Sequence, residues 1–154
     1  MKHTIRLTQQ KIGRYQNIVE TLVYRQLQQL APFRYKEMRE LDAHLLDAQF
    51  DDSDWVSLPP HSYWGGANIN FVMRGSFNVP ANFAADAPVA LHLPLGDAGQ
   101  FSHPEALVYL DGQPYAAVDR HHQEVLLPPE LRDGRSHHIL LWGWTSTVGY
   151  EAGK

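Results

Sequence analysis

Residues 106–118, ALVYLDGQPYAAV, contain two runs of apolar residues that meet at Asp111 and Gly112. An Asp-Gly pair between two such runs is typical of a two-residue hairpin, because both positions readily take the positive φ angles of a type I′ turn. The sequence therefore predicts two antiparallel strands, at residues 106–110 and 115–118, that are joined by this turn.

Further short apolar runs, separated by Gly, Pro, Asp and Asn, occur on both sides of this hairpin. They lie at residues 68–74, 76–79, 89–95, 123–127 and 137–144. Seven short strands in about 80 residues, with turn residues between them and no alternating long helices, are typical of an antiparallel β-sandwich. We therefore expect a mainly β domain over residues 51–154, cut short at its C-terminal end.

The first 50 residues have a different period. Apolar residues at steps of three and four between residues 8 and 30 predict an amphipathic helix that begins at Thr8 and ends before Pro32. The same pattern predicts a second amphipathic helix at residues 35–49. The expected organisation is a helical segment, residues 1–50, followed by the β-sandwich.

The composition excludes several classes of protein. The chain has 13 Lys and Arg against 17 Asp and Glu, and the formal net charge of −4 argues against a nucleic-acid-binding protein, which needs a basic face. The absence of cysteine excludes disulfides and Cys-based zinc sites and fits a reducing compartment. No apolar run approaches the roughly 18 residues of a transmembrane helix, and the N-terminus lacks the pattern of a signal peptide. We therefore expect a cytoplasmic protein that does not bind membranes.

The densest polar cluster is DRHHQE, at residues 119–124. If this stretch is extended, Asp119 and His121 share one face of the strand, and Arg120 and His122 share the other. Either face offers nitrogen and oxygen ligands to a divalent metal, but such residues more often form hydrogen bonds at the end of a strand. We predict that this chain has no metal site and no cofactor.

The sequence has few catalytic signals. It contains no Gly-x-Ser-x-Gly motif, so nothing supports a serine hydrolase. Paired carboxylates at about 5–9 Å would serve glycoside hydrolysis, and Glu105, Asp111, Asp119 and Glu124 are the candidates. Surface or turn positions are the more frequent use of such carboxylates, and we assign no catalytic residue.

The aromatic residues suggest a binding surface. Trp142 and Trp144 are two residues apart, so on a strand they point to the same side. The apolar face of a sugar stacks on such rings, while its hydroxyl groups need polar partners such as Asp119 and Arg120. A buried core needs the same spacing of aromatic residues. A sugar-binding platform that also includes Trp64 and a purely structural role both stay open.

Four motifs occur in an order that is familiar from one family. They are YWGG at residues 63–66, FVMRGSFNVP at 71–80, EALVYLDG at 105–112 and DRHHQEVL at 119–126. Over about residues 55–144 they resemble the N-terminal, non-catalytic domain of the cytosolic/vacuolar type of α-mannosidase in glycoside hydrolase family 38. The sequence departs from that pattern at Val72-Met73, where Trp-Phe is expected, and at 116–118, where a Gly is expected.

This resemblance implies a galactose-binding-like β-sandwich of jelly-roll type, preceded by the two helices. It implies an accessory domain that supports the catalytic domain of a parent α-mannosidase, whose zinc and aspartate nucleophile lie in that later domain. The alternative is a stand-alone carbohydrate-binding module. Both functions would use the same residues, either to bind carbohydrate or to dock on the catalytic domain: Trp64, Asp119, Arg120, His121, His122, Trp142 and Trp144. The first predicted helix is also expected to pair with its copy in a homo-oligomer.

Overall fold

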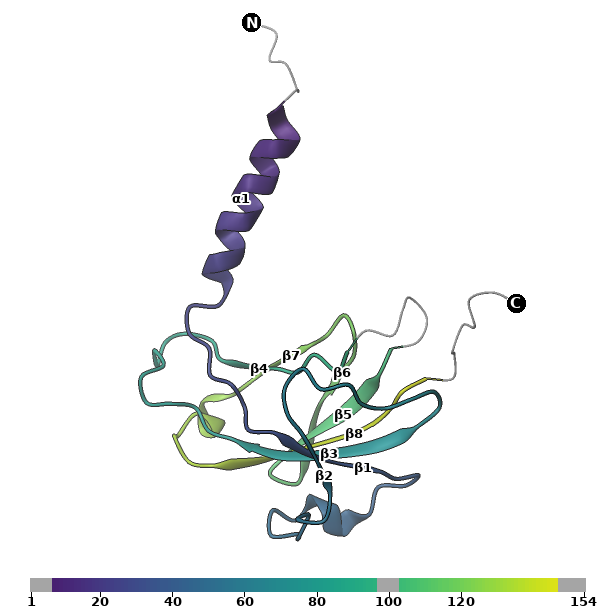
Figure 1. Ribbon diagram of the computed structural model, residues 1–154. Coiled ribbons are helices and arrows are strands. Elements are labelled where there is room, and N and C mark those ends of the chain that lie inside the picture. The colour runs from purple at the N-terminus through teal and green to yellow at the C-terminus, as the bar shows by residue number, and fades with distance from the viewer. Residues whose placement is uncertain (1–6, 97–102, 147–154) are drawn as a thin grey trace, which may run out of the picture.

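The computed structural model describes residues 7–96 and 103–146 (Figure 1). Its described part is mainly β, with the α-helix α1 (Thr8–Val23) and the short 3₁₀ helices η2 (Ala43–Leu46) and η3 (Pro129–Leu131). No helix among the described residues is both long and apolar enough to cross a membrane. The strands are β1 (Phe33–Glu37), β2 (Val56–Leu58), β3 (Asn70–Phe77), β4 (Ala90–His92), β5 (Glu105–Leu110), β6 (Gln113–Val118), β7 (Glu124–Leu126) and β8 (His137–Trp144).

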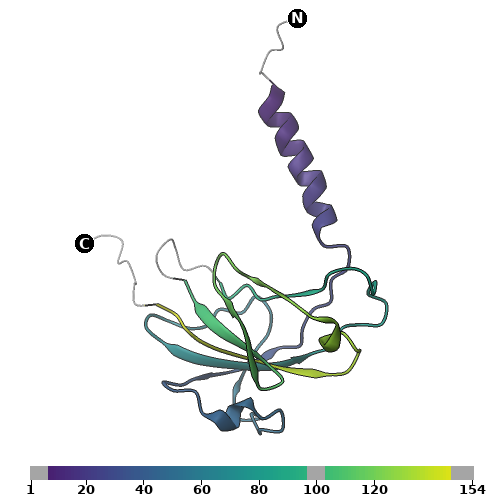
Figure 2. The same cartoon turned by 180° about the vertical axis from the view of Figure 1, so that it is seen from behind.

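Six strands form one antiparallel sheet in the order β2-β1-β3-β8-β5-β6 (Figures 1 and 2). The central strands β3 and β8 pair along their whole length, from Asn70 opposite Trp144 to Phe77 opposite His137. Strands β4 and β7 form a separate two-stranded sheet. The mainly β, antiparallel character predicted from the apolar runs is confirmed, and β8 has the predicted bounds.

The predicted hairpin turn is also confirmed. Leu110 pairs with Gln113, and the two residues between them, Asp111 and Gly112, have φ angles of 48° and 77°. Positive φ at both central positions is the requirement of a type I′ turn. The local chemistry of the Asp-Gly pair therefore defines how β5 and β6 are connected.

The main core lies between the six-stranded sheet and the β4–β7 pair. Phe71, Val108 and Ile139 of the large sheet are completely buried, and they belong to one apolar cluster with Leu91 of β4 and Val125 of β7. The two sheets therefore face each other across this core. The jelly-roll sandwich that the strand pattern and the resemblance predicted stays a prediction.

The predicted second helix is wrong. Residues 33–37 form strand β1, which pairs with β2 on one side and β3 on the other, and only residues 43–46 are helical, as a 3₁₀ turn. The apolar spacing was a weak signal over so short a stretch, and pairing with two strands distant in the sequence overrides it. Residues 56–58 form the edge strand β2. The first helix ends at Val23, before the predicted Leu30.

The segment at residues 38–55, below β1 in Figure 1, covers the other face of the six-stranded sheet. Its Leu45 and Trp55 are buried against Val72 of β3 and Leu140 of β8. Because both faces of the central strands are covered, residues 71–74 of β3 are buried on both sides of the sheet instead of alternating between buried and exposed. Helical propensity in this segment yields to this packing.

Arg74 is buried on this covered face, with only 2% of its surface exposed. Its Nε donates to Asp52 Oδ2 at 2.8 Å, its Nη2 to the Asp47 carbonyl at 3.0 Å, and its Nη1 to the Leu45 carbonyl. The Phe50 ring centroid lies 5.1 Å from the guanidinium carbon. One side chain of β3 therefore binds the 38–55 segment to the sheet at three points.

Replacing Arg74 with Met is expected to lower the free energy of unfolding by about 3 kcal/mol. The substitution keeps much of the apolar stem but leaves the Asp52 carboxylate and two carbonyl groups without their donor. Chemical denaturation followed by circular dichroism measures the change.

The matched control is Arg34→Met on the neighbouring strand. Arg34 makes a single weak hydrogen bond, 3.4 Å from Nη1 to the Trp55 carbonyl, so less than about 1 kcal/mol is expected. Equal losses in the two variants would show that Arg74 does not hold the segment in place.

Candidate functional site

A hollow of about 360 Å³ opens on the sheet face that bears Leu107 and Trp142, along strands β5, β6 and β8. Its floor includes the apolar side chains of Leu107, Ala117, Trp142 and Trp144. Polar residues also line it, namely Asn70, Glu105 and Asp119. The combination of an apolar floor and a few polar groups is typical of a ligand site.

The two Trp residues reach the hollow from β8, as their spacing predicted. Trp142 lies between Val72 of β3 and Leu107 of β5 in the sheet, and it packs partly against the cluster under the 38–55 segment. Trp144 is 36% exposed, and its indole Nε1 donates to Asn68 Oδ1 at 3.3 Å. Trp144 is therefore the ring that solvent or a ligand reaches.

Gly143, between the two Trp residues, determines how closely the strands approach. A Cβ atom at this position would overlap the Glu105 carbonyl and would lie only 2.6 Å from the Phe71 ring. The backbones of β8 and β5 come close together because no side chain separates them. This close approach fixes the positions of the neighbouring residues Trp142 and Trp144 relative to β5.

Asp119 is the central group of a turn, not of a strand. Its Oδ1 accepts hydrogen bonds from the backbone amides of His121, at 2.6 Å, and His122, at 2.8 Å. The His122 ring Nδ1 lies 3.0 Å from the same carboxylate. The hydrogen bond from this ring, with the two backbone amides, lowers the pKa of Asp119 to about 2. Asp119 is therefore an ionised hydrogen-bond acceptor and is unsuited to be a general acid.

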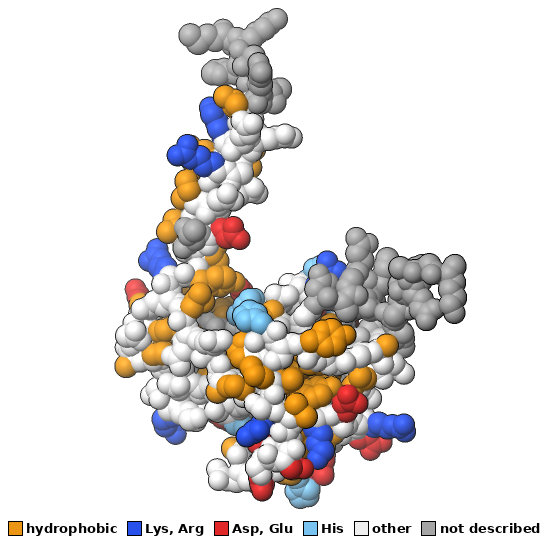
Figure 3. All heavy atoms as spheres, viewed as in Figure 1, with side chains coloured by type: hydrophobic (Ala, Val, Ile, Leu, Met, Phe, Trp, Pro, Cys, Tyr) orange, Lys and Arg blue, Asp and Glu red, His pale blue; other side chains and the backbone are white. Residues whose placement is uncertain are grey.

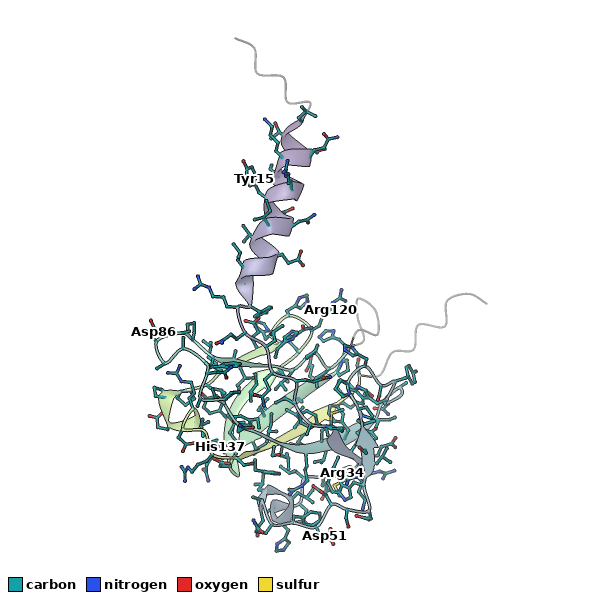
Figure 4. The ribbon with its side chains drawn as sticks, turned by 60° about the vertical axis from the view of Figure 1, so that its left-hand side comes forward. Tyr15, Arg34, Asp51, Asp86, Arg120 and His137 are labelled. Atoms are coloured by element: carbon teal, nitrogen blue, oxygen red, sulfur yellow. The ribbon has the colours of Figure 1, made fainter. Side chains whose placement is uncertain are left out.

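The other members of the polar cluster lie around the same turn. The backbone amide of Asp119 donates to the His122 carbonyl at 3.2 Å, so the stretch is not extended and the two predicted faces do not form. The His121 ring lies 6.3 Å from the His103 ring, and Gln123 Nε2 donates to the Arg120 carbonyl at 3.1 Å. Figure 4 shows Arg120 at the end of the body nearest to α1.

Trp64 lies apart from the hollow. Its ring packs edge-on against Phe71, with centroids 4.7 Å apart, and against Tyr35 at 5.7 Å. Both contacts belong to the core between the two sheets. The predicted platform of three Trp residues is thus divided: Trp142 and Trp144 line the hollow, and Trp64 helps to fill the core.

A second polar cluster was not singled out from the sequence. His137 is 5% exposed, with Nδ1 at 2.7 Å from Asp111 Oδ2 and Nε2 at 3.0 Å from Asp133 Oδ1. Its ring stacks on Phe77 at 5.5 Å. Asp111 also accepts the His138 amide at 2.8 Å. The cluster connects the β5–β6 turn and the turn before β8 to the first residue of β8, His137.

The charges in this cluster support one another. Burial opposes the charged form of His137, but its hydrogen bonds to Asp111 and Asp133 outweigh burial and raise its pKa. The backbone and side-chain bonds of Arg135 lower the pKa of Asp133 to about 2, with a further contribution from His137. Ionised carboxylates accept but do not donate, so both ring nitrogens carry protons. Within the described residues, no three or more His, Asp or Glu side chains are placed to hold a metal ion.

The His137 cluster is expected to make stability depend on pH in one direction. A His whose pKa is raised in the folded state adds stability that is complete below its ordinary pKa of 6.5 and is lost as the pH rises through the folded value. The difference in unfolding free energy between the wild type and His137→Gln should therefore be largest below pH 6.5 and should shrink as the pH rises above it. Denaturant titrations at a series of pH values measure it.

The control adds Asp133→Asn to both chains, which removes one of the carboxylates that favour the charged ring. The difference should then be smaller at pH 6 and should be lost completely at a lower pH, because less attraction supports the imidazolium and the folded-state pKa of His137 is raised less. A difference that stays constant or grows between pH 6 and 9 would contradict a charged His137.

No protein-family model matches the chain, and a search of the curated proteins finds no similar sequence. The resemblance to the α-mannosidase domain accordingly stays a prediction that rests on the four motifs of residues 63–126. The geometry of the hollow is therefore the basis of the proposed function.

Proposed function

We propose that the chain is a carbohydrate-binding accessory domain and that the hollow at Trp142 and Trp144 is its binding site. The observation that carries this proposal is the presence of two indole rings from one strand beside Asn70, Glu105 and Asp119 in a single open hollow. Its volume of about 360 Å³ is within the range of roughly 300–1,000 Å³ that is common for ligand pockets.

The apolar face of a sugar ring would stack on Trp144, which is exposed at the rim, and contact Leu107, which is 45% exposed. Stacking removes both apolar surfaces from water, and it orients the ring so that its hydroxyl groups point sideways. The hydroxyl groups would then donate hydrogen bonds to the carboxylates of Glu105 and Asp119.

The charge of the hollow favours an uncharged sugar. Glu105 and Asp119 both line it, and the low pKa of Asp119 keeps that carboxylate ionised throughout the physiological range. Sugar acids would be repelled by these two groups. Asp119 is also pre-positioned by its two backbone amides, so little entropy is lost when it accepts a ligand hydroxyl.

The second candidate is the docking of this domain onto the catalytic domain of a parent α-mannosidase, as the resemblance implies. The exposed apolar floor of the same hollow favours it, because an apolar patch beside polar groups is also typical of a protein interface. In this proposal the domain is of the galactose-binding-like, jelly-roll type, and zinc belongs to the parent's catalytic domain. The absence of cysteine supports the cytoplasm as its location.

Substituting Trp144 with Ala is expected to weaken binding of a neutral oligosaccharide at least tenfold. The loss of a stacked aromatic ring costs about 1.5–3 kcal/mol of binding free energy, and each 1.4 kcal/mol is a factor of ten. A screen of immobilised neutral glycans, followed by calorimetry on the best ligand, measures the affinity. Adding Asp119→Asn to the Trp144→Ala variant should weaken the affinity further.

The matched control is Tyr63→Ala. Tyr63 is 96% exposed but does not line the hollow, so its loss should leave the affinity unchanged. If no glycan binds, or if Tyr63→Ala weakens binding as much as Trp144→Ala does, the hollow is not a sugar site.

The docking candidate has its own test. It requires a coding frame that continues beyond residue 154 into a barrel with zinc-ligand His and Asp residues. In that full-length enzyme, Asp119→Ala should reduce mannosidase activity while the thermal unfolding of the β domain is retained. Loss of domain stability alone would limit Asp119 to fixing its own turn.

A further inference from the structure

Helix α1 projects from the β domain (Figures 1 and 2). It presents an apolar stripe to solvent. Ile12, Tyr15, Val19 and Leu22 are each between 51% and 67% exposed. Figure 4 shows Tyr15 on the projecting helix, away from the sheets. A 16-residue helix is marginally stable by itself, and most helices depend on packing of their apolar face.

The chain just after α1 is held on the β domain, so the helix is anchored at its C-terminal end. The Tyr24 hydroxyl donates to the Glu124 carboxylate, and the Tyr24 ring lies 6.1 Å from the His92 ring. Gln26 Nε2 donates to the Asn82 carbonyl at 3.1 Å. With its base attached in this way, α1 carries its stripe outward, where a partner can reach it.

The spacing of the stripe is that of a two-stranded coiled coil. Ile12 and Val19 are seven residues apart and occupy the a positions of a heptad, and Tyr15 and Leu22 occupy the d positions. β-branched residues at a, with Leu at d, favour two parallel helices. An identical helix offers the matching pattern, so the sequence of the stripe suits a second copy of the chain.

The charges on α1 allow the parallel arrangement. Lys11 occupies a g position and Gln16 an e position. In a parallel pair each g residue faces an e residue of the other helix, so Lys11 meets the uncharged Gln16 and not a second cation.

The same charge pattern disfavours a membrane surface as the partner. In Figure 3 the Lys and Arg side chains of α1 lie on the left of the helix, and an acidic side chain lies on the right. Glu20 is the only acidic residue of α1. Helices that bind anionic membranes carry cations across their polar face, whereas here the cations follow one edge of the stripe.

We propose that two copies of this chain associate through α1 as a parallel, two-stranded coiled coil, with Ile12, Tyr15, Val19 and Leu22 of each copy facing their counterparts. The stripe from Ile12 to Leu22 extends over about 15 Å of helix, so the contact is small beside the roughly 1,000 Å² of a stable specific interface. The dimer therefore depends on concentration, and the two β domains lie at the same end of it.

Sedimentation equilibrium over a concentration series is the test. The wild type should approach twice the monomer mass of 17.5 kDa as its concentration rises. The double variant Val19→Asp, Leu22→Asp should stay monomeric at the same concentrations, with the unfolding of the β domain unchanged. The matched control is Gln10→Asp with Asn17→Asp on the opposite side of α1, which adds the same charge and should still dimerise.

The orientation is tested with one cysteine, because the chain has none of its own. In the parallel pair, Ile12→Cys places the two sulfur atoms opposite each other, within the Cα separation of about 4.4–6.8 Å that a disulfide spans. Oxidation should then produce a covalent dimer. A dimer that persists without this cross-link would overturn the parallel arrangement.

Two further results would overturn the proposal as a whole. One is a wild type that stays monomeric at all concentrations, or a dimer that the double Asp variant does not disrupt. The other is a wild type that is monomeric in solution but cosediments with anionic phosphatidylserine vesicles and loses this binding in the double Asp variant. That result would identify a lipid surface as the partner.

Discussion

The buried guanidinium of Arg74 is the constraint on which the second face of the sheet depends. A cation in a buried position is stable only when its hydrogen bonds are made, and here the acceptors are Asp52 and the carbonyls of Leu45 and Asp47. The 38–55 segment must therefore follow one path across β3. It covers the sheet as far as Trp142, which packs partly against it. Beyond Trp142 the residues that the structure describes leave the hollow open.

Polar residues that seemed to offer chemistry mainly hold turns in place. Asp119 organises the turn that contains His121 and His122, and His137 joins two turns through carboxylates on both ring nitrogens. The carboxylates of Asp111, Asp119 and Asp133 lie in turns, and there they accept hydrogen bonds from backbone amides that the sheet leaves unpaired. The proposed function uses the same feature, because the Asp119 carboxylate is already fixed by its turn and can accept a hydrogen bond from a sugar hydroxyl without reorienting.

The predictions that succeeded and those that failed differ in the range of the interactions involved. The hairpin at Asp111-Gly112 was predictable because two adjacent residues define it, and β8 was predictable because its apolar run is long. The second helix was predicted wrongly because β1 exists only through its pairing with β2 and β3. The place of Trp64 could be known only from the fold, since its edge-on contacts with Phe71 and Tyr35 bring together three separate segments of the chain.

The sequence by itself determined the β character, the hairpin turn, the amphipathic first helix and the shared face of Trp142 and Trp144. Each depends on local periodicity or on the φ preferences of single residues, and these act without distant partners. Only the tertiary structure decided which face of the sheet is covered, that Asp119 and Glu105 line one hollow with these Trp residues, and that His137 meets two carboxylates. The physical reason is that these contacts join residues far apart in the chain, and strand pairing, not local pattern, brings them together.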